Sequence, residues 1–355
     1  MLTIEKTEGP AAHCGRPERE FEIREIAPLP QRKSMGCGAS TAARVGPEPT
    51  EIIEALDSST ETKATLSARL NGSLCLAPAL RPVLWPRLLE VGSSNTPDFA
   101  ALLERAGGDA GGGIDASYLK TIDADVPRTD RDEDAFRDAD GAGLRALRRL
   151  LLAHCARDGG DGYFQGMNDL AAVVLHAVDA TAGNDAAVAA AFGVFEGVLA
   201  DTRANWAHDD LAGVHAQARL VQLVLQAADP KLAKKLAAID ATRGAGAKDQ
   251  PLLFLFQPLF LRFKREMASY EETCRLWEAS WAWPGRGFHL LVAAALVRTQ
   301  RAALLKLRPG PEAIAEEATL FNRLVGTMHA APLVAAARAL GEVPAVRRVL
   351  ITQVV

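Results

Sequence analysis

The stretch from Gly143 to Asp158, GLRALRRLLLAHCARD, decides the fold class. Its leucines at 144, 147 and 151 recur at intervals of three and four residues, which brings them onto one face of an α-helix. The arginines between them fall on the opposite face. The stretch therefore predicts an amphipathic helix that packs one face into a core.

The same spacing continues through the rest of the chain from about residue 76. It is found in QARLVQLVLQAADPKLAKKLAAI, YEETCRLWEASWAW and FHLLVAAALVRTQRAALLKL, and the connections ARDGGDG, RGAGAKD and WPGRG are rich in glycine. Alternating runs of β-branched residues, which would indicate strands, are almost missing. We therefore predict an all-α fold with many helices over residues 76–355.

Residues 1–75 have a different composition, with stretches such as GPAAHCGRPERE and little hydrophobic periodicity. Such segments bury too little apolar surface to offset the entropy of ordering. We predict a largely disordered leader over 1–75, followed by one domain over 76–355.

Composition excludes several function classes. The net charge of −4 and the absence of a basic stretch argue against nucleic-acid binding. The five cysteines form no CxxC pair and the seven histidines no HxxxH pair, so no metal site is predicted. The apolar runs are shorter than the roughly 20 residues that span a bilayer. We expect an intracellular, cytoplasmic protein.

The stretch IDADVPRTDRD, residues 122–132, raises the question of what Arg128 does. Pro127 disfavours a helical conformation at Val126. The TDRD pattern that begins at Thr129 is typical of a helix start. We expect Arg128 in a loop just before a helix, where the alternative to a functional role is a surface ion pair worth under about 1 kcal/mol.

A second short motif is GYFQGMNDL, residues 162–170, which follows a glycine-rich turn and opens an apolar segment. Gln165 is expected at or just before the N-terminus of a helix, between Tyr163 and the small Gly166. The alternative is a turn in which the glutamine is merely solvated.

Taken together, the two motifs resemble the signature of the TBC domain of Rab GTPase-activating proteins. IDADVPR fits the pattern IxxDxxR and YFQGM fits YxQGM, in that order, with Arg128 and Gln165 37 residues apart. LRPVLWPRLLEVG and LRFKREMASYEETCRLWE are also similar to segments of this family. The resemblance covers about residues 77–305 and is closest to the yeast vacuolar-type subgroup.

The resemblance implies a TBC-type multi-helix domain that activates a GTP-bound Rab GTPase and so regulates membrane traffic. It implies that Arg128 is an arginine finger and Gln165 a glutamine finger, both supplied in trans. Asp125 would hold the arginine loop, and Tyr163, with Gly166 beside it, would support the glutamine; an ordinary core tyrosine is the alternative. A catalytically inactive Rab-binding module is the alternative function.

No cofactor and no independent enzymatic reaction are implied, since GTP and Mg²⁺ would come with the GTPase. This agrees with the absence of a GxxxxGK[ST] phosphate-binding loop. Departures from the family pattern leave the helix geometry and the retention of activity open: three prolines expected to interrupt helices, at Pro82, Pro86 and Pro258, and Met267 in place of a phenylalanine. We expect FKRE, residues 263–266, on a helix surface.

The leader contains MGCGAS, residues 35–40, which fits the N-myristoylation pattern. If translation starts at Met35, Gly36 would accept one acyl chain and Cys37 a second, and two chains give stable membrane attachment. The alternative is a chance match in a Gly/Ala/Ser-rich stretch. A peripheral association with endomembranes therefore stays open.

Overall fold

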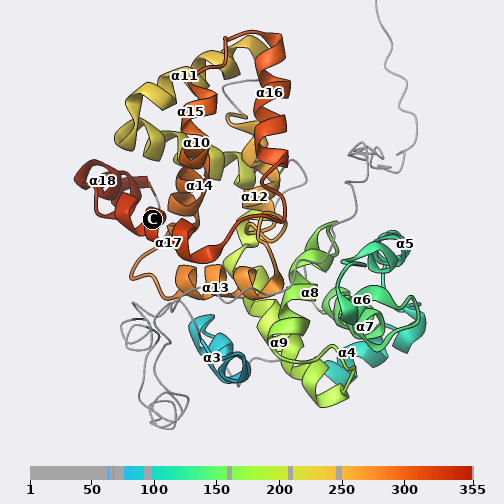
Figure 1. The fold of residues 1–355 in the computed structure, drawn as a ribbon. Helices are drawn as coiled ribbons and strands as arrows, with labels where there is room; N and C mark the ends of the chain where they lie inside the picture. The colour runs from blue at the N-terminus through green and yellow to red at the C-terminus, as the bar shows by residue number, and fades with distance from the viewer. Residues whose placement is uncertain are drawn as a thin grey trace, which may run out of the picture. The chain divides into compact units, whose positions relative to one another are not determined.

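The helical spacing of the sequence is realised as helices joined by short turns in the computed structural model (Figure 1). Apart from Lys63 and Ser67, the structure describes residues 76–91, 98–157, 162–206, 211–244 and 250–353. No strand occurs in these ranges, and the one β-bridge joins Met267 to Met328. The all-α fold is confirmed.

The residues of the predicted leader, including Gly36 and Cys37, lie outside the described part of the chain except for Lys63 and Ser67. Ala42–Val355 belongs to one unit, and all that follows lies within it. Lys63 forms an ion pair of 3.3 Å with Glu90, so contacts with the helical domain begin before residue 76.

The N-terminal half contains several short helices and, toward its end, three longer helices in succession. Its elements are η1 (Pro78–Leu80), α3 (Arg81–Leu88), α4 (Phe99–Arg105), η2 (Gly108–Ala110), α5 (Ala116–Asp125), η3 (Val126–Arg128), α6 (Asp134–Arg137), α7 (Ala142–Cys155), α8 (Met167–Ala177), α9 (Asp185–Asp201) and η4 (Arg203–Asn205).

The C-terminal half begins with two helices separated by the single residue Asp229 and ends with helices packed around α14. Its elements are α10 (Ala212–Ala228), α11 (Pro230–Asp240), η5 (Ala241–Arg243), η7 (Leu253–Leu255), α12 (Phe256–Phe260), α13 (Tyr270–Trp281), α14 (Phe288–Thr299), α15 (Arg301–Leu304), α16 (Pro311–Asn322), α17 (Ala330–Gly341) and α18 (Pro344–Gln353).

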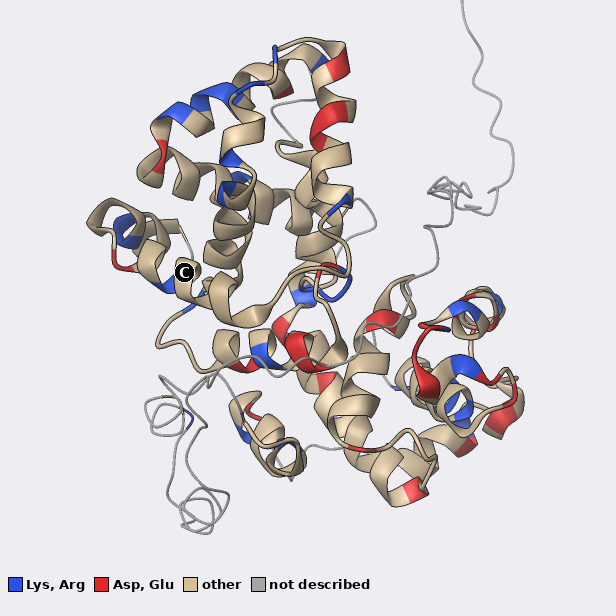
Figure 2. Cartoon of the chain, in the orientation of Figure 1, with Lys and Arg blue, Asp and Glu red and all other residues tan. Residues whose placement is uncertain are grey.

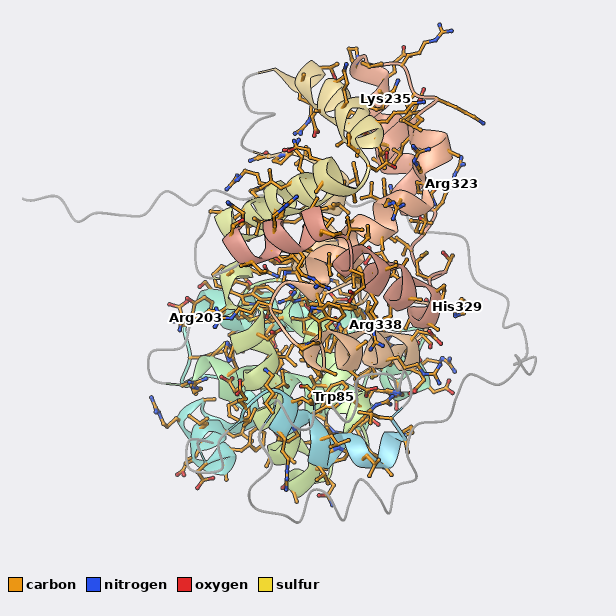
Figure 3. The ribbon with its side chains drawn as sticks, turned by 90° about the vertical axis from the view of Figure 1, so that its left-hand side faces the viewer. Trp85, Arg203, Lys235, Arg323, His329 and Arg338 are labelled. Atoms are coloured by element: carbon orange, nitrogen blue, oxygen red, sulfur yellow. The ribbon has the colours of Figure 1, made fainter. Side chains whose placement is uncertain are left out.

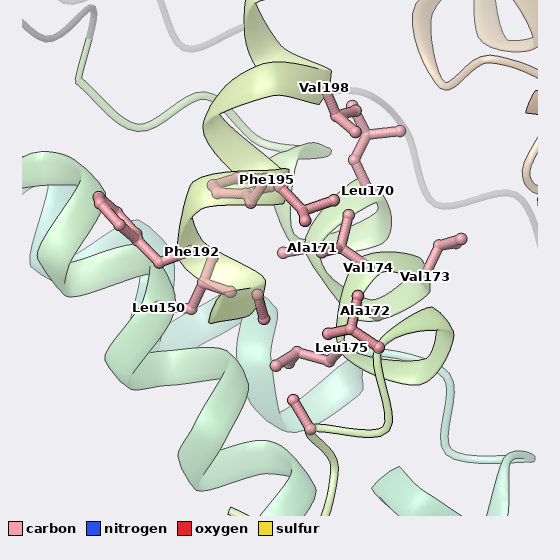
Figure 4. Packing of buried hydrophobic residues seen from close by; sticks show 14 of the residues in the cluster. Leu150, Leu170, Ala171, Ala172, Val173, Val174, Leu175, Phe192, Phe195 and Val198 are labelled. Atoms are coloured by element: carbon pink, nitrogen blue, oxygen red, sulfur yellow. The ribbon is translucent and has the colours of Figure 1, made fainter. Parts of the chain in front are cut away.

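Two hydrophobic clusters form the core. In the first, α7, α8 and α9 pack Leu150, Leu170, Phe192 and Phe195 together (Figure 4). The second surrounds α14, which packs against α10 and α17. Helix α13 serves both, because its tryptophans lie in the first cluster while Leu276 lies in the second.

The prolines interrupt less than the sequence suggested. Helix α3 has Pro82 at its start and continues through Pro86 to Leu88, so the expected break is wrong. Pro258 is the third residue of α12, within the first turn, where the missing N–H costs little. The first turn of a helix tolerates proline because its amides have no intrahelical partner.

Helix α3 is fixed to α13 by a buried guanidinium. Arg81 donates to Glu278 at 2.7 Å and to Glu271 at 2.7 and 2.8 Å. Trp85, labelled in Figure 3, lies on α3. It packs edge-on against Trp281, with ring centroids 4.9 Å apart. Trp277 and Trp281 are buried in the first cluster, and Trp283, just after α13, is half-buried against the second.

Charged residues of both signs lie on both halves (Figure 2). No helix in the described ranges is both long and apolar enough to cross a bilayer.

Candidate functional site

Arg128 ends a short 3₁₀ turn that continues directly from α5. Val126 has φ −56° and ψ −49°, so the prediction of an extended Val126 is wrong. Pro127 stands in the first turn of η3, where its fixed φ fits and no amide donor is required. The residue before a proline usually avoids the helical conformation, but Val126 adopts it here. We call residues 126–133 the arginine loop.

Thr129 does not start a helix, contrary to the prediction from TDRD. Its backbone is extended, and the next helix, α6, begins only after Glu133. The buried Thr129 hydroxyl instead donates to the Asp125 carbonyl at 2.8 Å. The hydroxyl therefore closes the arginine loop onto the end of α5.

The Arg128 side chain is exposed but anchored. It is 56% exposed, and its Nη2 lies 2.5 Å from Oδ1 of Asp125, whose side chain is 2% exposed. One nitrogen of the guanidinium is held while the rest of the fork faces outward.

Gln165 lies in the turn before α8, as predicted, and its side chain is exposed. We call residues 162–166 the glutamine loop. Gly166 is the N-cap of α8 with φ 106°, a backbone conformation that favours glycine. A Cβ added to it would come within 3.0 Å of Phe260 and Leu261. The glutamine loop thus lies directly on α12 and the turn that follows it.

Asp125 joins the two loops. Its second oxygen, Oδ2, accepts a 2.7 Å hydrogen bond from the Tyr163 hydroxyl. Burial and the Asp125 charge raise the pKa of Tyr163, so the hydroxyl remains a donor. Tyr163 also belongs to the first hydrophobic cluster, and so combines the supporting and the core role considered from the sequence.

A second bridge between the loops was not predicted. The amide of Asn168 donates to Thr129 Oγ1 at 2.9 Å, and its carbonyl oxygen accepts from the Gly166 backbone at 3.0 Å. The sequence signal was present, since Asn168 follows YFQGM within three residues of Gln165. The structure therefore brings all five predicted residues to one place: Asp125, Arg128, Tyr163, Gln165 and Gly166.

The FKRE segment is not a helix surface, so that prediction is wrong. It follows α12 as a tight turn in which Arg262 and Phe263 have φ of 48° and 64°. Lys264 and Glu266 are buried. The Lys264 and Glu266 side chains therefore point into the protein, and Lys264 bonds partners far away in the sequence, whereas Arg265 stays half exposed.

His154 is buried at the boundary of the first cluster, with Cys155 half-buried beside it. Its ring nitrogens lie 2.6 Å from Glu196 Oε1 and 3.2 Å from the Gly162 carbonyl, at the start of the glutamine loop. Across the described ranges, no three His, Cys, Asp or Glu side chains are grouped so that they could hold a metal ion.

Comparison with known proteins places these features in a family. Residues 78–305 match the family model described as Rab-GTPase-TBC domain. Human TBC1 domain family member 17 is 31% identical over 189 residues, 53% of this chain and 26% of that protein. GTPase-activating protein gyp7 of Schizosaccharomyces pombe is 27% identical over 225 residues, 59% of this chain and 28% of that protein. The chain thus corresponds to about a quarter of each relative's length.

Two solved structures share the fold. The Ypt/Rab-GAP domain of Gyp1p superposes with a TM-score of 0.64 at 14% identity, over 82% of this chain and 95% of that domain. The Chlamydomonas flagellar RabGAP TBC domain gives a TM-score of 0.58 at 19% identity, over 81% and 88%. Since the family model spans most of the described helices and both loops, the chain belongs to the Rab-GTPase-TBC domain family.

Proposed function

We propose that this protein is a GTPase-activating protein for a Rab-family GTPase, to which it supplies Arg128 and Gln165 in trans. The observation that carries the proposal is their placement: both side chains are exposed on the two loops that Asp125 ties together. Arg128 is bonded to this buried carboxylate directly, and Gln165 lies two residues after Tyr163, which is bonded to its other oxygen. Two exposed polar side chains on loops anchored in this way are suited to reach into a partner's site.

Arg128 would neutralise charge on the phosphate oxygens as the γ-phosphoryl group leaves. Its guanidinium stays charged, is planar and donates several hydrogen bonds, and an arginine supplied in this way accelerates hydrolysis about 10³- to 10⁵-fold. The bond from Nη2 to Asp125 holds one terminal nitrogen of the guanidinium while more than half of the side chain remains accessible.

Gln165 would orient the attacking water. Its amide accepts a hydrogen bond through oxygen and donates one through nitrogen, which are the two contacts that position a water molecule for in-line attack. The N-terminus of α8 directly behind it, capped by Gly166, gives this side chain a rigid support.

The partner in this proposal is a GTP-bound Rab GTPase that brings the nucleotide and Mg²⁺, so the activator needs no cofactor of its own. Relatives with activator names include GTPase-activating protein gyp7 and, in Caenorhabditis elegans, Rab GTPase-activating protein tbc-8. We place the action in membrane traffic, at the cytoplasmic side of endomembranes. The alternative is a Rab-binding module without activity; the presence of both exposed side chains favours the active function.

Single-turnover GTP hydrolysis across a panel of Rab GTPases tests the proposal. We expect Arg128→Ala to remove about 10³-fold of the acceleration, and Gln165→Ala to remove a comparable part. Arg128→Lys should restore little, because an ammonium lacks the planar fork. The matched controls are Arg145→Ala and Gln226→Ala, at exposed positions on α7 and α10.

The catalytic proposal would be contradicted if the unmodified protein accelerated no Rab, or if both alanine variants accelerated hydrolysis as much as the unmodified protein does. Binding of a GTP-loaded Rab without acceleration would support the alternative of a non-catalytic module.

A further inference from the structure

Two carboxylates placed just after the two loop residues meet at one ammonium group. Asp130 follows Arg128 by two residues, and Asp169 follows Gln165 by four, in the first turn of α8. Lys264 Nζ donates to Oδ1 of Asp130 and, at 2.9 Å, to Oδ1 of Asp169. A single side chain therefore links the arginine loop to the helix that supports the glutamine loop.

This ammonium is withdrawn from water. The Lys264 side chain is 7% exposed, and its Nζ lies 5.8 Å from the centre of the Tyr270 ring. The Tyr270 hydroxyl donates to the other oxygen of Asp130, and Arg265 donates to Asp169 at 3.0 and 3.3 Å. Each carboxylate is thus bonded from two sides, which fixes its orientation.

The charges keep these bonds in place at neutral pH. Burial lowers the pKa of Lys264, but Asp169 and Asp130 outweigh it and raise the pKa overall. Burial raises the pKa of Asp169, but Lys264 and Arg265 outweigh it and lower the pKa overall. The lysine therefore stays an ammonium and Asp169 a carboxylate.

Lys264 is presented by a stiff turn. The Phe263 amide donates to the Pro258 carbonyl at 2.7 Å, and the Lys264 amide to the Leu261 carbonyl at 3.1 Å. The indole of Trp277 donates to the Arg262 carbonyl at 2.9 Å. The same turn contacts the glutamine loop through Leu261, which faces Gly166. Its backbone is therefore held against both the core and the loop.

We propose that Lys264 is a positioning residue, which sets the spacing between Arg128 and Gln165 by holding Asp130 and Asp169 together. The proposal rests on the proposed function, since it assigns Lys264 a part in GTPase activation. Lys264 acts through the two carboxylates and touches neither nucleotide nor water. A misplacement of about 1 Å in a reacting group is enough to cost about 10²-fold in rate.

The opposing explanation is a buried ion cluster that stabilises the fold and nothing more. The two explanations predict different effects of substituting Lys264. A purely stabilising cluster affects activity and Rab binding together, through the folded fraction. A positioning residue lowers kcat while the affinity for a Rab loaded with a non-hydrolysable GTP analogue changes less than about threefold.

The experiment compares Lys264→Met, Lys264→Arg and Asp130→Asn with a matched control, Lys235→Met. Lys235 on α11 donates only to the Leu307 carbonyl in the structure, at 2.8 Å (Figure 3). We expect Lys264→Met to lower kcat about 10²-fold and Lys264→Arg, which can bridge two carboxylates, to recover to within about tenfold. Asp130→Asn keeps the shape of its side chain and should still lower kcat, and Lys235→Met should match the unmodified protein.

Arg128→Ala, measured alongside, separates this proposal from the proposed function. If Arg128→Ala abolishes acceleration and both Lys264→Met and Asp130→Asn retain the full kcat, the positioning proposal is overturned while the proposed function stands. An unmodified protein that accelerates no Rab refutes the proposed function. In that case, hydrogen exchange of the same variants decides whether Lys264 couples the loops.

For that measurement, we expect Lys264→Met to speed amide exchange in residues 126–133 and 162–169 together. Faster exchange confined to residues 261–267 would overturn the coupling of the loops. If Lys264→Met unfolds globally, the same comparison is made with Asp130→Asn.

Discussion

At the scale of single residues, Asp125 distinguishes this site from a chance pair of motifs. It is buried at the end of α5, and each of its oxygens serves a different loop: Oδ1 holds Arg128 and Oδ2 accepts from Tyr163. A carboxylate can accept on both oxygens at once, whereas an asparagine can accept on only one. This position therefore requires a side chain with two accepting oxygens, and a negative charge alone would not be sufficient.

We expect Asp125→Asn to lower kcat for the stimulated GTP hydrolysis by a Rab about tenfold or more, because either Arg128 or Tyr163 loses a charge-assisted hydrogen bond worth roughly 1.5–3 kcal/mol. Single-turnover kinetics measures this. Asp123→Asn is the matched control: Asp123 is exposed on the same helix and, within the described ranges, forms its ion pair with Arg148, at 2.9 Å. Wild-type kcat in Asp125→Asn would show that the loop does not depend on this carboxylate.

At the scale of elements, the start of α8 determines where Gln165 stands. Gly166 caps the helix with a positive φ and lies against Phe260 and Leu261 of the neighbouring segment. Both the backbone conformation and the lack of space therefore require glycine.

Gly166→Ala should destabilise the protein by about 1–3 kcal/mol and reduce GTPase activation by more than the lost folded fraction explains. Urea unfolding and single-turnover hydrolysis on the same samples test this. Gly108→Ala, at φ 61° with no atom within 4 Å of the added Cβ, controls for backbone strain alone. Equal effects of the two substitutions would mean that contact with Phe260 and Leu261 is unimportant.

At the scale of the whole molecule, a buried acid on α16 makes stability depend on pH. Glu317 is buried, and its Oε1 has no hydrogen-bond partner among the described residues. Burial, with the nearby charge of Asp240, raises its pKa from the ordinary 4.5 to about 8. The folded chain therefore keeps a proton that the unfolded chain releases between these values, and stability falls as the pH rises through that window.

Glu317→Gln removes this dependence. The variant should be more stable than the unmodified protein at pH 8.5 by about 1.4 kcal/mol for each pKa unit of the true shift, and the advantage should vanish near pH 4. Urea midpoints from pH 4 to 8.5 measure it, with the exposed neighbour Glu316→Gln as control. Glu266, whose pKa burial raises to about 7, contributes the same trend in both proteins and cancels in the comparison. A difference independent of pH would refute the assignment.

The sequence by itself determined the helices and singled out the residues of the candidate site. Amphipathic spacing is a local property, so α7, α10, α11 and α13 could be found from it. The two motifs fixed Arg128 and Gln165 by residue type and order, and Asp125 and Tyr163 came with them. These predictions needed no knowledge of which segments meet in space.

Only the tertiary structure decided what the polar residues around the motifs bind. Thr129 looked like a helix cap, but its hydroxyl reaches the Asp125 carbonyl and receives a hydrogen bond from Asn168, 39 residues away. FKRE looked like a helix surface, but Lys264 bonds Asp130 across 134 residues. Hydrogen bonds between distant segments leave no periodic trace in a sequence, because they depend on how helices pack. The sequence therefore names the residues of the site, and packing determines which partners hold them.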